Sequence, residues 1–572
     1  MTGIRATAVN IAVRVRSRRA ALMLAALILL VGVLVLSPIG IILFKTIRAA
    51  DGGLGLDAWA RAFAEPGIVR SIINTISVVI ATQLISIPIS IVIAWLLART
   101  DLPWRRGLEF GFWIAFLIPV LGTTTGWILL LDPVFGLINQ ALRFIGIGGS
   151  DGLFNIYSYW GIVFTHLVTL SISVKVILLT PGFRNLDASL EEASRMSGAG
   201  TFATLTRIVL PVLTPVLIVV SLMALIRALE AFEIELILGR PIDFSVYSTK
   251  MYMLLRSSPP DVPSATVLAT VILMLLMPLA LLERWMSTRR SYTTVTGKQN
   301  LSLHKLRRWR WPAFLLVAGA VLMMTVIPVI FQVVGSLMTL FGFFDIDNVW
   351  TFQHWRRALG QPAFGRTLSN SLLIGLGTVA FALLVFSMLG YVIARSRYRA
   401  GALLDFLAWL PFTIPGVILG LGILQFVLNV PLMRPIFGSI WVMIFAAGLT
   451  SITLSVQLFK TGFLQISPEM EEASRVSGAS WLHTFRVVDM PLILPTTAVV
   501  AMMVFASAIR QVGALVFLFT GKTQPLSILQ LELLFDSELG AAAVVGTVVV
   551  LIGVSVAIFA RFIEGRFSLD TT

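Results

Sequence analysis

The side chains best able to make specific contacts belong to an acidic segment that occurs twice, 280 residues apart. The first copy is Glu191-Glu192-Ala193-Ser194-Arg195-Met196-Ser197-Gly198, and the second is Glu471-Glu472-Ala473-Ser474-Arg475-Val476-Ser477-Gly478. Each copy is a polar island between long apolar stretches, and a proline follows each at the same distance, Pro211 or Pro491. Carboxylates in such a loop can pair with basic or backbone N–H groups of another protein. The repetition indicates two equivalent docking sites for a partner outside the bilayer.

A second group of ionisable side chains lies within apolar sequence and consists of Arg227, Glu230, Glu233 and Glu235, with Arg510 at the place in the second half that matches Arg227. Charged side chains inside a membrane are costly and usually face a cavity or a partner. Arg227 and Glu230 are three residues apart and can pair on one helix face. Two interpretations stay open: these residues line a polar path through the membrane, or they form a structural ion pair between two helices.

Groups for bond chemistry are scarce. The chain has no cysteine, which excludes disulfides, thiolate metal sites and thiol catalysis. Its four histidines are scattered without metal-ligand spacing, so we expect no metal site. Gly521-Lys522-Thr523 resembles the end of a phosphate-binding loop, but Val516 replaces the first glycine of that motif and the segment falls in a predicted outer loop. We therefore expect no catalytic residue and no nucleotide site in this chain.

The composition is that of a membrane protein. The chain is 57% hydrophobic and 12% charged, with a mean hydropathy of +0.94, whereas soluble domains are about one quarter charged. Apolar runs of about 20 residues cross a bilayer as helices. The first run is long and lacks a small-residue cleavage site, which favours a retained helix over a signal peptide. Twelve spans are predicted, at about 21–44, 71–97, 108–131, 157–181, 211–237, 264–283, 313–340, 367–394, 404–428, 437–459, 491–519 and 540–563.

The net charge of +15 could suggest nucleic acid, but the distribution of the charge indicates membrane topology. With the N-terminus in the cytoplasm, most of the 43 Lys and Arg fall in cytoplasmic segments, as the positive-inside rule requires. The basic stretch 284–312 suits lipid headgroups. We therefore expect a multi-pass protein of a bacterial inner membrane, with both termini and the loops 182–210 and 460–490 in the cytoplasm, and no nucleic acid partner.

The repeat extends beyond the acidic segment. Three further pairs match between the halves: Arg70-x3-Asn74 with Arg366-x3-Asn370, Ala98-Arg99-Thr100 with Ala394-Arg395-Ser396, and Ile118-Pro119 with Ile414-Pro415. Six helices per half give both halves the same orientation, which makes a parallel repeat. The fold class expected is an all-α polytopic membrane protein with two pseudo-symmetric halves, 1–283 and 313–572, joined by a basic cytoplasmic linker, 284–312.

Each repeated loop predicts a helix, a glycine stop and a second helix. Ser467 and Pro468 suit the N-cap and first position of a helix, and Asp187 occupies the place of Ser467 in the first copy. Gly198 and Gly478 suit a left-handed helix end. A rigid elbow of this kind can transmit force from a partner.

This pattern resembles the coupling loop of ABC-importer permeases, Glu-Ala-Ala-x3-Gly-x9-Ile-x-Leu-Pro, and the resemblance covers about 60–565. Copy one departs from it by Ser194, and copy two has Ser474, Val488 and Met490 at the Ala, Ile and Leu positions. The resemblance implies two copies of a cytoplasmic ABC ATPase that bind ATP and Mg, and a periplasmic or lipid-anchored solute-binding protein. The ATPase-coupling residues that it implies are Glu191, Glu192, Ala193, Gly198, Glu471, Glu472, Ala473 and Gly478.

The fused form, with Leu229-Glu230-Ala231-Phe232-Glu233 and Gly239-Arg240-Pro241, is similar to ferric-iron-type permeases, which implies ferric iron as the solute. Fused permeases for thiamine and for aminoethylphosphonate share the design, so a small organic solute is the alternative. Two other classes remain: a secondary transporter driven by an ion gradient, which would leave the repeated loops unexplained, and a structural membrane scaffold.

Overall fold

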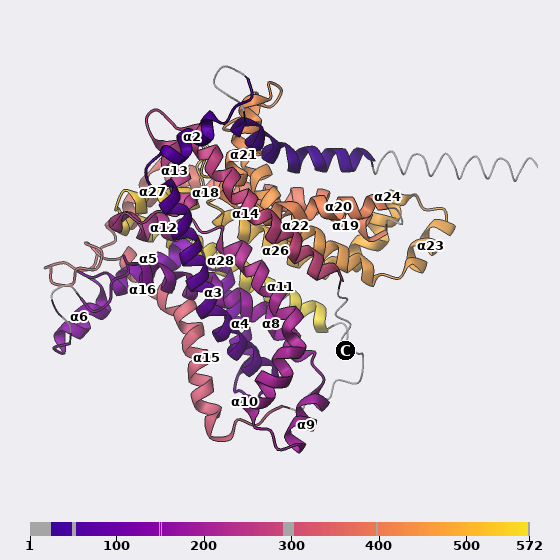
Figure 1. Ribbon diagram of the computed structural model, residues 1–572, viewed down its shortest axis with the longest axis horizontal. Helices are drawn as coiled ribbons and strands as arrows, with labels where there is room; N and C mark the ends of the chain where they lie inside the picture. The colour runs from indigo at the N-terminus through magenta and orange to yellow at the C-terminus, as the bar shows by residue number, and fades with distance from the viewer. Residues whose placement is uncertain are drawn as a thin grey trace, which may run out of the picture. The chain divides into compact units, whose positions relative to one another are not determined.

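The protein is helical throughout the part that the computed structural model describes, which comprises residues 25–47, 53–147, 149, 152–289, 303–395 and 399–569 (Figure 1). These residues form no β-strand, and their only β-type pairings are two isolated bridges, Thr100 with His304 and Met338 with Trp350. The predicted all-α class is confirmed. Among the described residues, nine helices are long and apolar enough to cross a membrane, or up to twelve if each of three bent helix pairs is one span.

Two of the bends replace predicted continuous spans, and both fall at the matched Ile-Pro pairs. Helices α4 (Arg105–Leu117) and α5 (Val120–Leu131) meet at 99° around Pro119, and Gly401–Thr413 meets Gly416–Asn429 at 110° around Pro415. Proline lacks an N–H and disfavours helical geometry at the residue before it. Accordingly, Ile118 and Ile414 are extended, with ψ of 134° and 118°. The third bend, of 80°, separates Trp481–Leu492 from Leu494–Arg510.

The chain divides into two compact units that each draw on both predicted halves. One unit comprises 46–371 and 521–558. Its central helix, α3, packs against α8, α14 packs against α13 and α11, and α16 packs against α5. Its helices are α2 (Asp57–Ala64), α3 (Ile68–Arg99), α4, α5, α6 (Leu137–Phe144), α7 (Tyr159–His166), α8 (Ile172–Arg184), α9 (Ala188–Met196), α10 (Thr201–Thr204), α11 (Leu210–Ala228), α12 (Glu233–Leu238), α13 (Tyr247–Arg256), α14 (Val262–Arg289), α15 (Arg310–Met324), α16 (Val326–Ser336), α17 (Gln353–Gly360), α27 (Leu526–Phe535) and most of α28 (Leu539–Leu569).

The other unit comprises 1–45, 372–520 and 559–572. Within it, α22 packs against α19 and α26. Its described helices are Ala25–Thr46, α19 (Ser387–Arg395), α20 (Arg399–Trp409), α21 (Gly416–Asn429), α22 (Ile440–Gln465), α23 (Pro468–Val476), α24 (Trp481–Thr484), α25 (Met490–Leu492) and α26 (Leu494–Arg510), and α18 (Pro362–Phe381) crosses the division. The units describe packing, whereas the boundaries at 283 and 313 describe the sequence repeat and stay a prediction.

The sequence repeat is also seen in a part of the structure far from the acidic loops, where the same kinds of hydrogen bond hold the start of a short helix in each half. In the first half, Thr75 Oγ1 accepts the Tyr247 N–H at 2.9 Å, and Asn74 Nδ2 donates to the Ser245 carbonyl at 2.9 Å. Two adjacent polar side chains of α3 therefore fix the start of α13.

The second half repeats this arrangement. Ser371 Oγ accepts the Leu526 N–H at 2.7 Å, and Asn370 Nδ2 donates to the Lys522 carbonyl at 3.0 Å. The Gly521-Lys522-Thr523 segment is thus a loop that is hydrogen-bonded to α18 and leads into α27.

Candidate functional site

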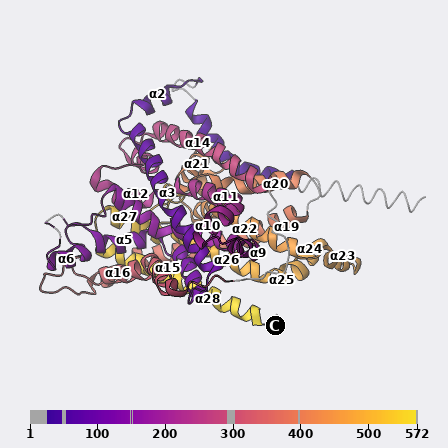
Figure 2. The same ribbon diagram turned by 60° about the horizontal axis from the view of Figure 1, so that its bottom comes forward.

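The first acidic loop folds as the predicted elbow. Asp187 Oδ1 accepts the Ser189 N–H at 2.9 Å at the start of α9, and this hydrogen bond lowers the pKa of the Asp187 carboxyl. Helix α9 ends before Gly198, whose φ of +81° only glycine adopts without strain. Helix α10 follows and, through a π-helical turn over Leu205–Val209, leads into α11. The short helices α9 and α10 lie close to each other in both views (Figures 1 and 2).

The second loop has the same course. Helix α23 begins at Pro468 after Ser467, although the Ser467 side chain makes no capping hydrogen bond there. Gly478 has a φ of +89°, and α24 leads through a π-helical turn over Phe485–Asp489 toward α25 and α26. The prediction of a left-handed glycine in both elbows is confirmed.

A buried ion pair holds the first elbow to the membrane helices. Arg99, at the end of α3, donates from Nε to Glu191 Oε1 at 2.9 Å and from Nη1 to the Leu186 carbonyl at 3.1 Å. The two charged side chains are only 1% and 6% exposed. Removing either side chain would leave the other charge buried without its ion-pair partner, which is the costly state.

The same pair recurs in the second elbow. Arg395, at the end of α19, donates from Nε to Glu471 Oε1 at 2.5 Å and from Nη2 to the Ile466 carbonyl at 3.0 Å. The Tyr391 hydroxyl adds a hydrogen bond to Glu471 Oε2 at 3.0 Å. In each elbow an Arg–Glu ion pair therefore holds the short helix in place, and the arginine also donates to a backbone carbonyl just before that helix.

The predicted coupling residues separate into two groups. Glu191 and Glu471 point inward and are used internally, whereas Glu192 and Glu472 are exposed. Ala193 and Ala473 are exposed as well. Of each glutamate pair, only the second is available to a partner.

A hydroxyl contact closes each elbow and accounts for the departure from alanine in the motif. Ser194 Oγ lies 2.8 Å from Thr204 Oγ1, and Ser474 Oγ lies 2.9 Å from Thr484 Oγ1. These contacts join the first short helix to the second in both copies, so the serine stabilises the elbow.

Each elbow also exposes large apolar side chains at equivalent positions, and Met196 and Val476, just before the glycines, are 89% and 88% exposed. Exposed apolar patches next to charged groups are typical of protein interaction sites. The equivalent pairs are Leu190 with Met470, Met196 with Val476, and Phe202 with Leu482.

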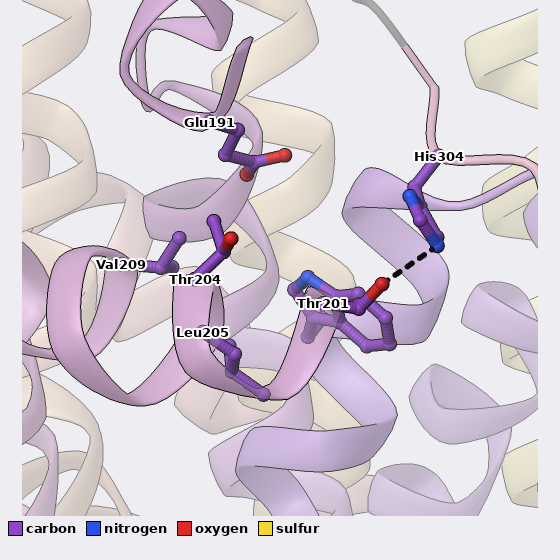
Figure 3. A pocket seen from close by; sticks show the side chains of 7 residues that line it. Glu191, Thr201, Thr204, Leu205, Val209 and His304 are labelled. Atoms are coloured by element: carbon purple, nitrogen blue, oxygen red, sulfur yellow. Dashed lines mark hydrogen bonds between the residues drawn. The ribbon is translucent and has the colours of Figure 1, made fainter. Parts of the chain in front are cut away.

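The interior behind the two elbows is filled differently. Behind the first lies a mostly aliphatic core that includes Leu179 and Val209 around the ring of Phe183. A small pocket beside it is lined by Trp95, Glu191, Thr201, Thr204, Leu205, Val209 and His304 (Figure 3). Of these lining residues, His304 comes from outside the loop and from outside α3.

Behind the second elbow, aromatic rings take the same places. Trp481 stacks on Phe485 at 5.7 Å between ring centroids and 18° between planes. Both rings contact Tyr391, at 5.7 and 5.2 Å. Asp489 is fully buried here, and neither of its carboxylate oxygens has a hydrogen-bond partner among the described residues.

The ionisable cluster is spread over a break between helices. Arg227 Nη1 donates to Glu230 Oε2 at 2.7 Å, so the predicted contact is observed, with side chains 45% and 24% exposed. The pair lies where α11 ends, and Glu233 begins α12. Arg510 ends α26 in the other unit. Whether these residues line a path stays a prediction.

Glu235 has a partner that the sequence did not indicate. It is 1% exposed, and its Oε1 lies 2.6 Å from His166 Nε2 at the end of α7. The two residues are 69 positions apart in the sequence, so no local spacing indicates that they pair. In the described part of the chain, no three His, Asp or Glu side chains are grouped to hold a metal ion.

The fold and these two loops are those of a polytopic, all-helical membrane protein. The same elbow, held by an Arg–Glu ion pair, occurs twice in it. Residues 386–569, which include the second elbow, match the family described as binding-protein-dependent transport system inner membrane component. This match supports the resemblance of the chain to ABC-importer permeases.

Three relatives give the resemblance its extent. A probable ABC transporter permease of Sinorhizobium fredii is 28% identical over 72% of this chain and 73% of its own length. A ferric transport system permease of Actinobacillus pleuropneumoniae is 24% identical over 72% of this chain, and the match spans 59% of that relative. A molybdate/tungstate transport system permease of Pyrococcus abyssi is 28% identical over 41% of this chain and 95% of its own length. All three are named as permeases, which confirms the prediction that this chain is a permease and not an ATPase.

Proposed function

We propose that this chain forms the whole translocation pathway of an ATP-driven importer, with twelve spans in two parallel six-helix halves. Each coupling loop docks one copy of a cytoplasmic ABC ATPase, which binds ATP and Mg. Closure of the ATPase pair moves both loops and opens the pathway outward to a loaded solute-binding protein, and hydrolysis resets it.

The observation that supports this proposal is that the same helix–glycine–helix elbow occurs twice, with the same ion pair and equivalent exposed side chains. In both elbows a buried Arg–Glu pair fastens the short helix, while a glutamate and three apolar side chains remain exposed. A loop that is fastened on one side and exposed on the other suits the transfer of motion from a partner to the helices. An ion-gradient transporter or a scaffold has no use for two such loops.

Ferric iron is the solute that we propose, supported by the ferric relative and by the resemblance of 229–241 to ferric-iron-type permeases. The relative named for molybdate and tungstate favours an oxyanion as the second candidate. Recognition rests mainly on the binding protein, so purifying the cognate binding protein and measuring its affinity for Fe³⁺ and for molybdate distinguishes the two. Tight binding of molybdate without Fe³⁺ would overturn the iron proposal.

Transport itself is tested in proteoliposomes that contain the permease and its cognate ATPase, with the loaded binding protein outside. We expect uptake of ⁵⁵Fe that requires both ATP and the binding protein. Uptake driven by an ion gradient without ATP would contradict the proposal.

The orientation of the loops is tested in intact cells. The chain has no cysteine, so Ser197→Cys and Ser477→Cys each introduce a single reactive thiol on an exposed elbow. We expect a membrane-impermeant maleimide to label both only after permeabilisation. Efficient labelling from outside would overturn the proposed topology.

A further inference from the structure

The C-terminal part of the predicted linker 284–312, which the structure describes from residue 303 onward, lies along the end of α3. The His304 N–H donates to the Arg99 carbonyl at 2.8 Å, and the Asp101 N–H donates to the His304 carbonyl at 3.2 Å. The Leu306 N–H donates to Asp101 Oδ1 at 2.8 Å. Three hydrogen bonds therefore attach this segment directly beside Arg99, the residue that fastens the first coupling loop.

The His304 side chain continues from this attachment into the loop. Its Nε2 lies 3.2 Å from Thr201 Oγ1, at the first residue of α10, and Figure 3 shows the two side chains pointing toward each other. Its ring lies 6.2 Å from the Trp95 ring, between centroids. The imidazole thus bridges α3 and α10 and lines the pocket that also contains Glu191.

In the second copy, a residue of the loop itself takes this role. Trp481 occupies the position equivalent to Thr201, and Tyr391 the position equivalent to Trp95. The Trp481 and Tyr391 rings lie 5.7 Å apart. In the second loop the ring beside Tyr391 is that of Trp481, which belongs to the loop. In the first loop the ring beside Trp95 is that of His304, which comes from outside the loop.

We propose that His304 is a positioning residue for the first coupling loop, acting through Thr201 and Trp95 in the place that Trp481 fills in the second. This inference rests on the proposed function for its consequence: the segment between the halves sets the position of one ATPase docking site. It gives the loop a second fastening besides the Arg99–Glu191 pair, at the other end of the elbow. The two loops thereby differ in which part of the chain supplies the positioning ring, although their exposed faces match.

The first test measures loop mobility and needs no knowledge of transport. A spin label attached through Ser197→Cys reports on the first elbow, and one attached through Ser477→Cys reports on the second. The two serines are matched, since each is exposed and donates to the carbonyl four residues earlier, at 3.0 and 2.9 Å. In the full-length protein we expect His304→Ala to raise the mobility of the first label and to leave the second unchanged.

Two further variants separate positioning from a loss of folding. His304→Gln keeps a side-chain hydrogen-bonding group and should retain most of the wild-type spectrum. Adding Thr201→Trp to His304→Ala supplies the ring from the loop, as the second copy does, and should restore the rigid spectrum. Unchanged mobility in His304→Ala, or an equal rise at both labels, would overturn the proposal.

The consequence for coupling is measured by titrating the permease in nanodiscs with its ATPase. With one hydrogen bond and a ring contact removed, we expect His304→Ala to raise the half-saturating ATPase concentration about threefold to tenfold, with little change in maximal ATP hydrolysis. If wild-type permease does not bind the ATPase, the proposed function fails; if wild type binds and His304→Ala binds equally well, only the role of His304 fails.

Discussion

The two elbows share the ion pair that holds the short helix and differ in the side chains packed behind it. Arg99–Glu191 and Arg395–Glu471 make the same contacts to side chain and backbone. Around them, one loop has a mostly aliphatic core with a single buried phenylalanine, Phe183, and the other has a cluster of stacked aromatic rings. The ion pair fixes where each short helix lies, whereas many apolar combinations can fill the space behind it. The position of the elbow is therefore the feature that both halves retain.

The largest effect should come from reversing charge on the exposed faces of both loops. We expect Glu192→Arg with Glu472→Arg to abolish co-purification of the ATPase, since like charges across a contact cost several kcal/mol, on the order of a hundredfold or more in affinity. Asp57→Arg, at an exposed carboxylate on α2, is the control and should have no effect. A double variant that is present at the wild-type level and binds ATPase normally would remove the loops from the mechanism.

Removing the arginine of either Arg–Glu pair should destabilise the protein, and the loss should be larger for the first pair than for the second. Arg99→Met leaves Glu191 buried without its ion-pair partner and should destabilise the protein by about 3–5 kcal/mol. Arg395→Met should cost less, because Tyr391 still donates to Glu471 and this site is more exposed, at 18% and 9% against 1% and 6%. Thermal unfolding in detergent measures both.

The matched control removes both charges at once. Arg99→Met with Glu191→Leu should recover most of the lost stability, since no unpaired charge remains. A double variant as unstable as Arg99→Met alone would show that the contact to the Leu186 carbonyl, and not the ion pair, carries the effect.

Asp489 offers a smaller difference between the copies. Its equivalent in the first loop is Val209, which belongs to the aliphatic core. Because neither Asp489 oxygen has a hydrogen-bond partner in the described residues, Asp489→Val should stabilise the protein by about 1–3 kcal/mol. The reverse change, Val209→Asp, should destabilise it. A loss of stability in Asp489→Val would mean that this carboxylate is paired within the second elbow.

The smallest effect is expected at Arg227 and Glu230, whose pair is partly exposed. Exposed pairs contribute about 0–1 kcal/mol, so Arg227→Met should change thermal unfolding little, in contrast to Arg99→Met. If the residue lines the pathway, the same variant should fold normally and lose uptake. Normal folding together with normal uptake would remove Arg227 from the pathway.

Local sequence was sufficient for the elbows and for the contact of Arg227 with Glu230. A glycine after a short acidic helix and a spacing of three residues are both local signals. The sharp bends at Pro119 and Pro415 are not evident from hydropathy, because apolar composition continues through each bend while the proline ends the helix; each bent pair can still be one span. Hydropathy therefore predicts how long an apolar segment is, but it does not predict that the helix changes direction within the segment.

The features of the site that the sequence did not predict depend on contacts between residues far apart in the chain. Which glutamate of each pair turns inward depends on Arg99 and Arg395, which lie 92 and 76 residues from their partners. The His304–Thr201 contact spans 103 residues. The matching Ala-Arg pairs ending the two helices were a usable signal for the first contact, whereas no signal marked His304.

The central claim is that the two elbows are two docking sites, and the stoichiometry of the complex tests it most directly. Native mass spectrometry of the complex purified from the membrane should give two ATPase subunits for each copy of this chain, and Glu192→Arg with Glu472→Arg should remove both. A stable complex with one ATPase subunit, or one that keeps both subunits in that double variant, would contradict the account.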